Sequence, residues 1–316
     1  MTSPLIVVTG ASGFIGKHLL DATKGRAVLA LSRTSKAPTP GEDHLRWVEG
    51  DLASAQCWQA VLKPGCTVIN LAYPTSLCAE DAVSAARNMV AACAEFQAAR
   101  LVHCSTVSVY GRTEGGVIDE STPCRPQDEY GRTKLAIEEA ILGADAGACD
   151  VGVLRPAAVF GPGGRNLVTL AQSLQHGSVV TNYLRASLFG RRRMHLVPVE
   201  AVVAALVFLS DSARPLSGRV FNVAEDDDEL NNFQDVERML AKGLGVGGRS
   251  VAPLPIPLWV LRMLLRSRGR SELDPHCIYR SDRIRSWGFV SPVSFESALA
   301  AFADNFGSDT STRGPS

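Results

Sequence analysis

The chain has 316 residues, of which 46% are hydrophobic, and its 32 basic side chains balance 32 acidic ones. This composition is ordinary for a globular protein, and the length allows one large α/β unit or two closely joined domains. Zero net charge gives no reason to expect a nucleic acid as a partner.

The N-terminus, the apolar runs, the cysteines and the histidines argue against further classes of protein. The N-terminus lacks the basic stretch and the cleavable apolar segment of a signal peptide. No uninterrupted apolar run approaches the roughly eighteen residues of a membrane span. The eight cysteines form no C-x-x-C pair and the six histidines are scattered singly. We therefore expect a cytoplasmic protein with reduced cysteines, no metal site and no membrane partner.

Short apolar runs alternate with amphipathic stretches through the first half of the chain. Helical patterns are expected at residues 14–24, 81–97 and 129–142, where apolar residues recur every three or four positions. Strands are expected at residues 5–9, 27–31, 45–49, 67–71, 101–105 and 150–154. Such alternation predicts an α/β fold with a doubly wound parallel sheet of the Rossmann type, which binds ligands at the carboxyl ends of its strands.

The alternation weakens beyond Phe160, where Gly161-Pro162-Gly163-Gly164 breaks the chain before a helix near Asn166. Later elements are expected at residues 199–209, 219–223, 232–244 and 294–306, the second as a strand and the others as helices. We predict a dinucleotide-binding core at 1–160, to which later segments return, and a smaller lobe at 161–306 that mainly binds substrate. The tail 307–316 is rich in Ser, Thr, Gly and Pro and is predicted to be disordered.

A glycine turn, residues 9–16, follows the first predicted strand and opens the first predicted helix. Glycines there let the backbone approach a pyrophosphate, which the helix N-terminal amides then face. A tight loop can also need glycine for purely conformational reasons, so the position after the first strand carries the prediction. The turn supplies six candidate dinucleotide contacts, namely Gly10, Ser12, Gly13, Phe14, Ile15 and Gly16.

The end of the second strand normally contacts the adenosine ribose, and here it reads Ser32-Arg33. Arg33 can pair with the 2′-phosphate of NADP, and no carboxylate stands at Ser32 to repel that phosphate. NADP is therefore the expected cofactor, with NAD as the alternative, unless Arg33 is simply a surface arginine. Further candidate contacts follow the third and fourth strands, at Asp51, Leu52, Leu71 and Ala72.

Tyr130 and Lys134 are four residues apart at the start of a predicted helix and so share one of its faces. A lysine charge nearby favours the phenolate and would lower the tyrosine pKa toward neutrality. Such a pair is common by chance, and alone it is more often structural than catalytic. His103-Cys104-Ser105-Thr106, however, ends the fifth strand at the edge where ligands bind, and a hydroxyl there can polarise a carbonyl.

In this order the motifs resemble the extended short-chain dehydrogenase/reductase family, also called the NAD-dependent epimerase/dehydratase family, over residues 5 to 305. The resemblance is carried by Thr-Gly-Ala-Ser-Gly-Phe-Ile-Gly at 9–16, Ser-Thr-Val-Ser-Val-Tyr-Gly at 105–111, Tyr-Gly-Arg-Thr-Lys at 130–134 and Leu-Arg-Pro-Ala-Ala-Val-Phe-Gly-Pro-Gly at 154–163. It implies a nicotinamide-dependent enzyme, which in this family often dimerises through two helices.

The resemblance also assigns roles. Thr106 becomes the active-site hydroxyl, with Ser105 as the alternative, Tyr130 the acid-base residue, and Lys134 its ribose-binding partner. Tyr110 is expected to pack or to line the substrate site. Two further residues, Pro156 and Val159, are expected to border the nicotinamide.

Three features bear on the reaction. Dehydratases of this family carry an Asp-Glu pair directly after the active threonine, where this chain has Val107 and Ser108. Epimerases retain NAD and usually carry the acidic ribose-binding residue that this chain lacks. Their diphosphate-binding asparagine is replaced by Ala158, so Asn166 and Arg193, in the basic cluster Arg191-Arg192-Arg193, are the candidates instead. A solvated basic loop is the competing interpretation of that cluster.

The second half is more loosely similar to bacterial 4-keto reductases that act on UDP-N-acetyl amino sugars for surface polysaccharide. We therefore expect a reductase of a nucleotide-sugar ketone. The alternatives are a nucleotide-sugar C4-epimerase with bound NAD and a reductase of a non-sugar carbonyl such as a steroid or flavonoid-like ketone. A non-catalytic NADP sensor is a fourth hypothesis, which the retention of Thr106, Tyr130 and Lys134 disfavours.

Overall fold

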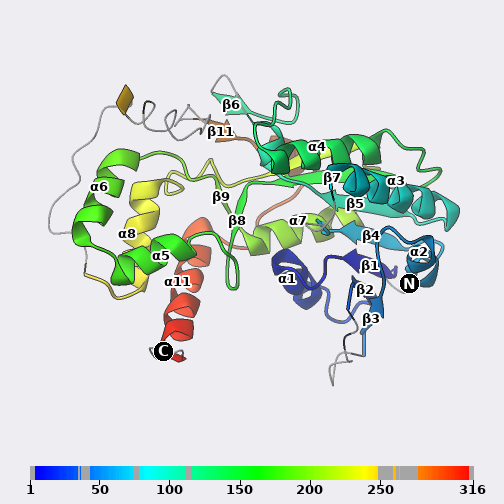
Figure 1. The fold of residues 1–316 in the computed structure, drawn as a ribbon, viewed down its shortest axis with the longest axis horizontal. Coiled ribbons are helices and arrows are strands. Elements are labelled where there is room, and N and C mark those ends of the chain that lie inside the picture. The colour runs from blue at the N-terminus through cyan, green and yellow to red at the C-terminus, as the bar shows by residue number, and fades with distance from the viewer. Residues whose placement is uncertain are drawn as a thin grey trace.

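The structure is a computed structural model that describes residues 4–34, 36, 43–73, 78–111, 116–247, 259–260, 263 and 277–312. A sheet flanked by helices lies beside a smaller helical lobe (Figure 1). Among the described residues, no helix is both long enough and apolar enough to cross a membrane.

The central sheet has seven parallel strands in the order β10-β7-β5-β4-β1-β2-β3. This order confirms the predicted doubly wound sheet, because the chain builds outward from β1 first in one direction and then in the other. The strand ends on either side of β1 therefore meet at one edge. The strands are β1 (Ile6–Thr9), β2 (Val28–Ser32), β3 (Leu45–Glu49), β4 (Thr67–Asn70), β5 (Arg100–Cys104), β7 (Asp150–Pro156) and β10 (Arg219–Val223).

Both faces of the sheet are buried, and alternate residues of each strand enter different cores. In β1, Ile6 and Val8 pack with α1 (Phe14–Ala22) and α7 (Val199–Asp211), whereas Val7 packs on the opposite face. That second face is covered by α2 (Ala55–Val61), α3 (Ala79–Glu95) and α4 (Glu129–Leu142) (Figure 1).

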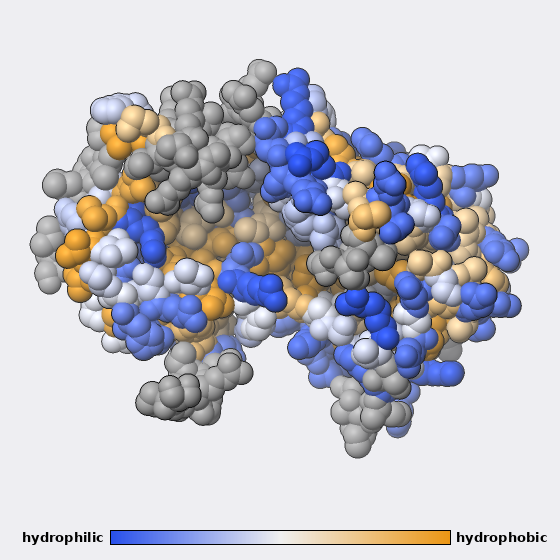
Figure 2. Space-filling view, in the orientation of Figure 1, coloured by the Kyte–Doolittle hydropathy of each residue, from blue (hydrophilic) through white to orange (hydrophobic). Residues whose placement is uncertain are grey.

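The smaller lobe has its own apolar core, in which Phe160 contacts Phe295 edge-on at 5.6 Å between ring centroids. Apolar residues also gather in the hollow between this lobe and the sheet (Figure 2). Its elements are β8 (Ala158–Phe160), β9 (Leu196–Pro198), α5 (Val168–His176), α6 (Val179–Phe189), α8 (Phe233–Gly243) and α11 (Phe295–Thr312). Four short elements complete the fold, namely η1 (Val107–Val109), β6 (Val117–Ile118), β11 (Ile278–Tyr279) and α10 (Asp282–Ser286).

The last helix corrects one prediction. The tail was expected to be disordered from Gly307, but α11 continues to Thr312, while 313–316 lie outside the described residues. Phe306 stacks on Phe302 at 6.0 Å, and the helix continues through Gly307 because a single glycine weakens a helix without ending it, while the first proline after it is Pro315.

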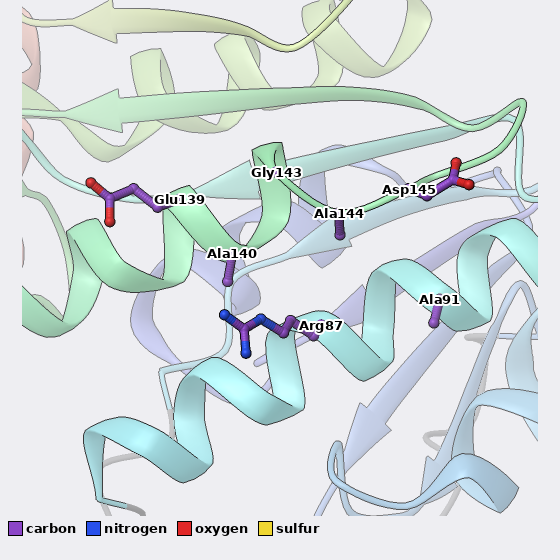
Figure 3. A pocket seen from close by; sticks show the side chains of 7 residues that line it. All are labelled: Arg87, Ala91, Glu139, Ala140, Gly143, Ala144 and Asp145. Atoms are coloured by element: carbon purple, nitrogen blue, oxygen red, sulfur yellow. The ribbon is translucent and has the colours of Figure 1, made fainter.

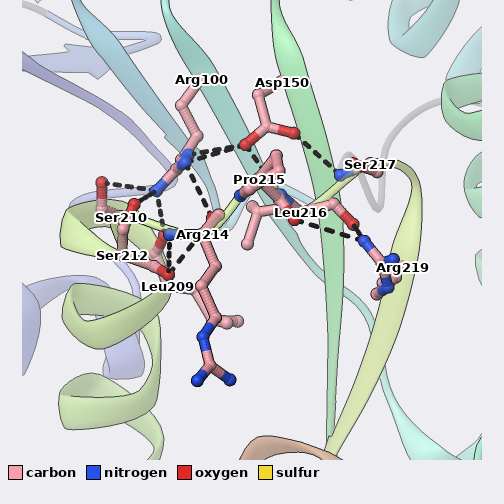
Figure 4. Close-up of polar contacts among 10 residues, drawn as sticks. All are labelled: Arg100, Asp150, Leu209, Ser210, Ser212, Arg214, Pro215, Leu216, Ser217 and Arg219. Atoms are coloured by element: carbon pink, nitrogen blue, oxygen red, sulfur yellow. Dashed lines mark hydrogen bonds and ion pairs between the residues drawn. The ribbon is translucent and has the colours of Figure 1, made fainter. Parts of the chain in front are cut away.

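Arg100 and Asp150 join the amino ends of β5 and β7 to the segment that follows α7 (Figure 4). Arg100 Nη2 lies 2.8 Å from Asp150 Oδ2, and Nη1 donates to the last carbonyls of α7. Asp150 in turn accepts from the amides of Leu216 and Ser217 at 2.9 and 2.8 Å. A cation at a helix C-terminus satisfies carbonyls that have no intrahelical partner.

Replacing this arginine should therefore destabilise the fold. We expect Arg100→Ala to lower the free energy of unfolding by about 2–3 kcal/mol, because Asp150 and the helix carbonyls lose a charged partner. Urea denaturation measures the change. Lys24→Ala is the control, because it removes an ion pair in which the side chains of Lys24 and Asp21 are 61% and 68% exposed. It should lower the free energy of unfolding by less than about 0.5 kcal/mol. Equal losses in the two variants would contradict the role given to Arg100.

Candidate active site at the carboxyl ends of the strands

The glycine turn packs against the end of β4. Gly10 has φ +67°, and a Cβ there would lie 2.8 Å from the amide nitrogen of Ala72. A Cβ on Gly16 would lie 2.4 Å from the carbonyl oxygen of Gly10, which already accepts from the Gly13 amide at 2.9 Å. Both positions therefore need glycine because of close backbone contacts as well as the turn itself.

Helix α1 begins directly at this turn. Gly13 caps it without a side-chain hydrogen bond, so its first amides have no capping partner on the turn. Ser12 and Gly13 are exposed, Phe14 and Ile15 half-buried, and Gly16 buried. A compact turn with open amides at a helix N-terminus fits a dinucleotide pyrophosphate. The residues present thus fit a nicotinamide dinucleotide.

The other candidate cofactor residues lie at the same edge. Ser32 is buried at the end of β2, and Arg33 follows it on the surface. Asp51 is exposed, with Oδ1 accepting from the amide of Ala53 at 3.0 Å. The remaining three candidates, Leu52, Leu71 and Ala72, are half-buried after β3 and β4.

The turn at 161–164 brings the smaller lobe against α1. His18 Nε2 lies 2.9 Å from the carbonyl oxygen of Pro162, and a Cβ on Gly164 would lie 2.7 Å from the Phe14 ring. Pro156 is buried at the end of β7, whereas Val159 is half-buried in β8. The link between the two parts of the molecule therefore runs beside the cofactor turn.

Lys134 lies inside the protein, under the site. Only 3% of the residue is exposed, and Nζ donates to the carbonyl oxygen of Cys104 at 3.1 Å. Nζ also lies 5.1 Å from the ring centroid of Tyr73, a residue that the sequence analysis did not single out. Burial lowers the pKa of Lys134, because the charged form loses hydration.

Tyr130 occupies the first turn of α4, which Asp128 caps by accepting from the Gly131 amide at 2.7 Å. Its ring meets Tyr73 edge-on at 5.1 Å. Tyr73 thus contacts both members of the predicted catalytic pair. Its position directly after Asn70-Leu71-Ala72 is the only sequence signal that could have found it.

The pKa of Tyr130 differs from the expectation. The residue is 41% exposed, but partial burial of its phenol raises the pKa to about 12, and an interaction with Thr106 only partly opposes that rise. The predicted lowering by Lys134 is not seen. The structure shows contacts of the ammonium with the Cys104 carbonyl and the Tyr73 ring, and burial of the phenol sets the direction of the Tyr130 shift.

Thr106 is nearly buried, with 9% of the residue exposed, and its side chain caps η1 by accepting from the Ser108 amide at 3.2 Å. Ser105 Oγ is buried and finds no hydrogen-bond partner within the described part of the chain. Thr106 lowers the pKa of Tyr130 and Ser105 is not among the causes of its shift, so Thr106 stays the predicted active-site hydroxyl.

Three buried polar side chains form a row of hydrogen bonds across the ends of three strands beneath the site. Thr9 Oγ1 donates to Asn70 Oδ1, and Asn70 Nδ2 lies 2.9 Å from His103 Nδ1. Burial, together with the charge of Lys134, holds the pKa of His103 well below its usual value, so the ring is neutral. The amide nitrogen must then donate to Nδ1, which leaves the proton on Nε2. The spacing of these three residues gave no hint of this contact.

The candidates for substrate diphosphate binding are already engaged elsewhere. Arg193 Nη1 donates to the carbonyl oxygen of Asp228 at 2.6 Å, and Asn166 Nδ2 donates to that of Val159 at 2.7 Å. Arg191 is exposed and lies 3.7 Å from Asp235. These residues do not meet Thr106 and Tyr130 in the contacts that the structure describes, so their substrate role stays a prediction.

Two cavities lie away from this constellation. One, of about 360 Å³, opens between α3 and α4 beside Arg87 and Glu139 (Figure 3). Another, of about 810 Å³, is lined by α1, α7 and residues 288–293. Neither includes a predicted catalytic side chain. Within the described ranges, no three His, Cys, Asp or Glu residues are placed to hold a metal ion.

Comparisons with known proteins show the family of the chain. The model of the NAD dependent epimerase/dehydratase family matches residues 6–224. The dTDP-4-dehydrorhamnose reductase of Mycobacterium tuberculosis H37Rv is 31% identical over 242 residues, 71% of each chain. That of Mycolicibacterium smegmatis is 36% identical over 190 residues, but the match covers 54% of this chain and only 51% of that relative.

Two other similarities extend further along the chain. The UDP-glucose 4-epimerase of Vibrio cholerae is 22% identical over 293 residues, which cover 85% of this chain and 83% of that protein. The solved structure of MoeE5, in complex with UDP-glucuronic acid and NAD, is 26% identical and has a TM-score of 0.69. It covers 96% of this chain and 99% of its own.

The steric role of the glycine turn can be tested with a matched pair. We expect Gly10→Ala to lower the free energy of unfolding by roughly 3 kcal/mol, since strain at positive φ adds to a clash with backbone. Gly25 also has positive φ, +84°, but has nothing within 4 Å of a new Cβ. Gly25→Ala should therefore cost only about 1 kcal/mol. Similar losses in urea denaturation would mean that contact with β4 does not require glycine.

Proposed function

The chain belongs to the NAD dependent epimerase/dehydratase family, and from that premise we propose that it is an NADP-dependent oxidoreductase that reduces the keto group of a nucleotide sugar, of the 4-keto-hexose type. The proposal is supported chiefly by one observation: Lys134, buried in the helix that begins beside Tyr130, donates to the Cys104 carbonyl at the end of β5, just before Thr106 and at the edge that also carries the glycine turn.

The side chains divide the work as follows. Thr106 and Tyr130 donate hydrogen bonds to the ketone oxygen, which polarises the carbonyl. With a pKa of about 12, the phenol is protonated at neutral pH and can act as the acid. The glycine turn would hold NADPH, which would supply the hydride. As the oxygen gains charge, Tyr130 passes it a proton, while Lys134 keeps the ribose-binding role that the family resemblance implies.

The choice of a nucleotide-sugar ketone draws on two supports. The Mycobacterium tuberculosis relative is named as a reductase of a dTDP-linked keto sugar and matches 71% of this chain. Val107 and Ser108 stand where an acid and a base would be needed for dehydration. A homodimer, a cytoplasmic location and a role in surface polysaccharide synthesis stay predictions.

The reductase is tested by NADPH oxidation with a panel of dTDP- and UDP-linked 4-keto sugars. We expect turnover with at least one of them and none with the corresponding alcohols. Protein that is purified with tightly bound NAD, interconverts UDP-sugar C4 epimers and consumes no NADPH would instead be an epimerase. Turnover of a steroid or flavonoid-like ketone alone would replace the sugar as substrate.

Removal of the acid should stop chemistry without stopping cofactor binding. We expect Tyr130→Phe to lower kcat by about 10²–10⁴-fold, while the Kd of NADPH changes less than about threefold. Tyr110→Phe is the matched control, because its hydroxyl donates to Asn222 Oδ1 at 2.8 Å within the core. It should cost about 1 kcal/mol of stability and little activity. Full turnover by Tyr130→Phe would refute the catalytic assignment.

The preference for NADP is attributed to Arg33. We expect Arg33→Ala to weaken NADPH binding about 10- to 100-fold, since a charge-assisted hydrogen bond to the 2′-phosphate is lost. NADH carries no such phosphate, so its Kd should hardly change. Fluorescence titration with both cofactors measures the two effects. Equal losses for NADPH and NADH would remove the argument for NADP.

A further inference from the structure

Three residues from separate parts of the chain form a hydrogen-bonded row outside the candidate active site. Cys277 Sγ lies 3.4 Å from His195 Nε2, and His195 Nδ1 lies 2.6 Å from Asp226 Oδ2. Cys277 precedes β11, His195 precedes β9, and Asp226 follows β10. In such a row the imidazole can take the thiol proton, while the carboxylate orients the imidazole.

The carboxylate end of the row is rigidly held. Asp226 is fully buried, and its two oxygens also accept from the amide of Tyr279 at 2.9 Å and from Asn231 Nδ2 at 3.3 Å. The His195 ring is fixed further by the Tyr279 ring, which it meets edge-on at 5.0 Å. The imidazole is therefore positioned from both sides before any ligand arrives.

His195 also has unusual backbone geometry. Its φ of +53° lies in the left-handed region, although the residue is not glycine. Hydrogen bonds on both sides hold this backbone conformation in place. The His195 carbonyl accepts from the Ala158 amide at 2.8 Å, and the Leu196 amide donates to Asn231 Oδ1 at 3.2 Å. Backbone strain of this kind persists where the surroundings enforce it, and it gathers at functional positions.

The hydrogen-bond partners of His195 favour the protonated form of its imidazole. Burial of the ring opposes its protonation, but hydrogen bonds with Asp226 and Cys277 outweigh that effect and raise the pKa of His195 to about 10. An imidazole within hydrogen-bond reach of a thiol can take part in proton transfer with the sulfur as it attacks an electrophile. The row is not arranged as a metal site, since the described residues include no group of three potential ligands placed for one.

We propose that Cys277 is a nucleophilic thiol that forms covalent adducts with small α,β-unsaturated carbonyl compounds. Its sulfur bonds to the β-carbon, and the electron pair of the C=C bond moves to form an enolate. His195 then returns to the enolate the proton it took from sulfur, so no oxidant or reductant is consumed. Cys277 is half-buried against apolar core residues, which favours a small, uncharged electrophile.

This site is independent of the proposed reductase, because it uses none of Thr106, Tyr130 or Lys134. The unmodified protein contains its own control. Cys124 is half-buried like Cys277 and packs against the same core, but burial raises the pKa of its thiol, and its charged neighbours include no imidazole.

The first experiment treats the folded protein with limiting N-ethylmaleimide at neutral pH and follows each cysteine by peptide mass spectrometry. We expect Cys277 to be labelled at least about tenfold faster than Cys124, because among the described residues only Cys277 of the two has an imidazole within hydrogen-bond reach that can assist its proton transfer, whereas burial raises the pKa of Cys124. Labelling of the two cysteines at equal rates would overturn the proposal.

The second experiment tests the imidazole. In a Cys78→Ser background, which removes the exposed thiol, His195→Gln should slow labelling of Cys277 at least about tenfold and leave the Cys124 rate unchanged. An unchanged Cys277 rate in a protein that still melts cooperatively would refute the role of His195. If His195→Gln fails to fold, Cys124 will react faster as well. The labelling rates of Cys277 and Cys124 in the unmodified protein then decide whether Cys277 is the nucleophile.

Discussion

Lys134 and Glu138 lie one turn apart on α4 and attach that helix to two neighbouring strands. Lys134 donates to the Cys104 carbonyl at the end of β5, and Glu138 accepts from Arg155 Nε of β7 at 3.0 Å. Glu138 is 1% exposed and Arg155 6%. A buried charge without its partner costs several kcal/mol, so α4 has one favourable register against the sheet. Tyr130, one turn before Lys134, is held at the strand ends by that register.

The glycine turn imposes a second constraint on the same edge. Gly10 lies so close to the segment after β4 that the two strand ends cannot separate without losing backbone contact. Below them, the hydrogen bonds from Thr9 through Asn70 to His103 link β1, β4 and β5. The edge that carries the candidate cofactor and catalytic residues is therefore fixed by backbone packing as well as by a buried polar chain.

Sequence patterns predicted the helices and strands whose bounds depend on neighbouring residues along the chain. The strands at 45–49 and 219–223 and the helix at 129–142 have the expected bounds, because period and flanking residues determine them. Contacts between distant segments could not be predicted in this way. Tyr73 meets Tyr130 and Lys134 only because β4 and α4 adjoin at one edge. Arg193 lay within a basic run, and nothing in that run showed that Asp228 would bind it.

Burial leads to different charge states for three buried basic groups of this chain. Lys134 has a backbone carbonyl as its partner, which offers only a partial charge, so burial dominates and disfavours the ammonium. His103 faces an amide and a neighbouring cation, and its charged form is disfavoured further. His195 faces the buried carboxylate of Asp226, whose full charge outweighs the loss of hydration. Burial alone therefore does not decide whether a base is charged at neutral pH. The decisive factor is whether the buried partner is a carboxylate or only a dipole.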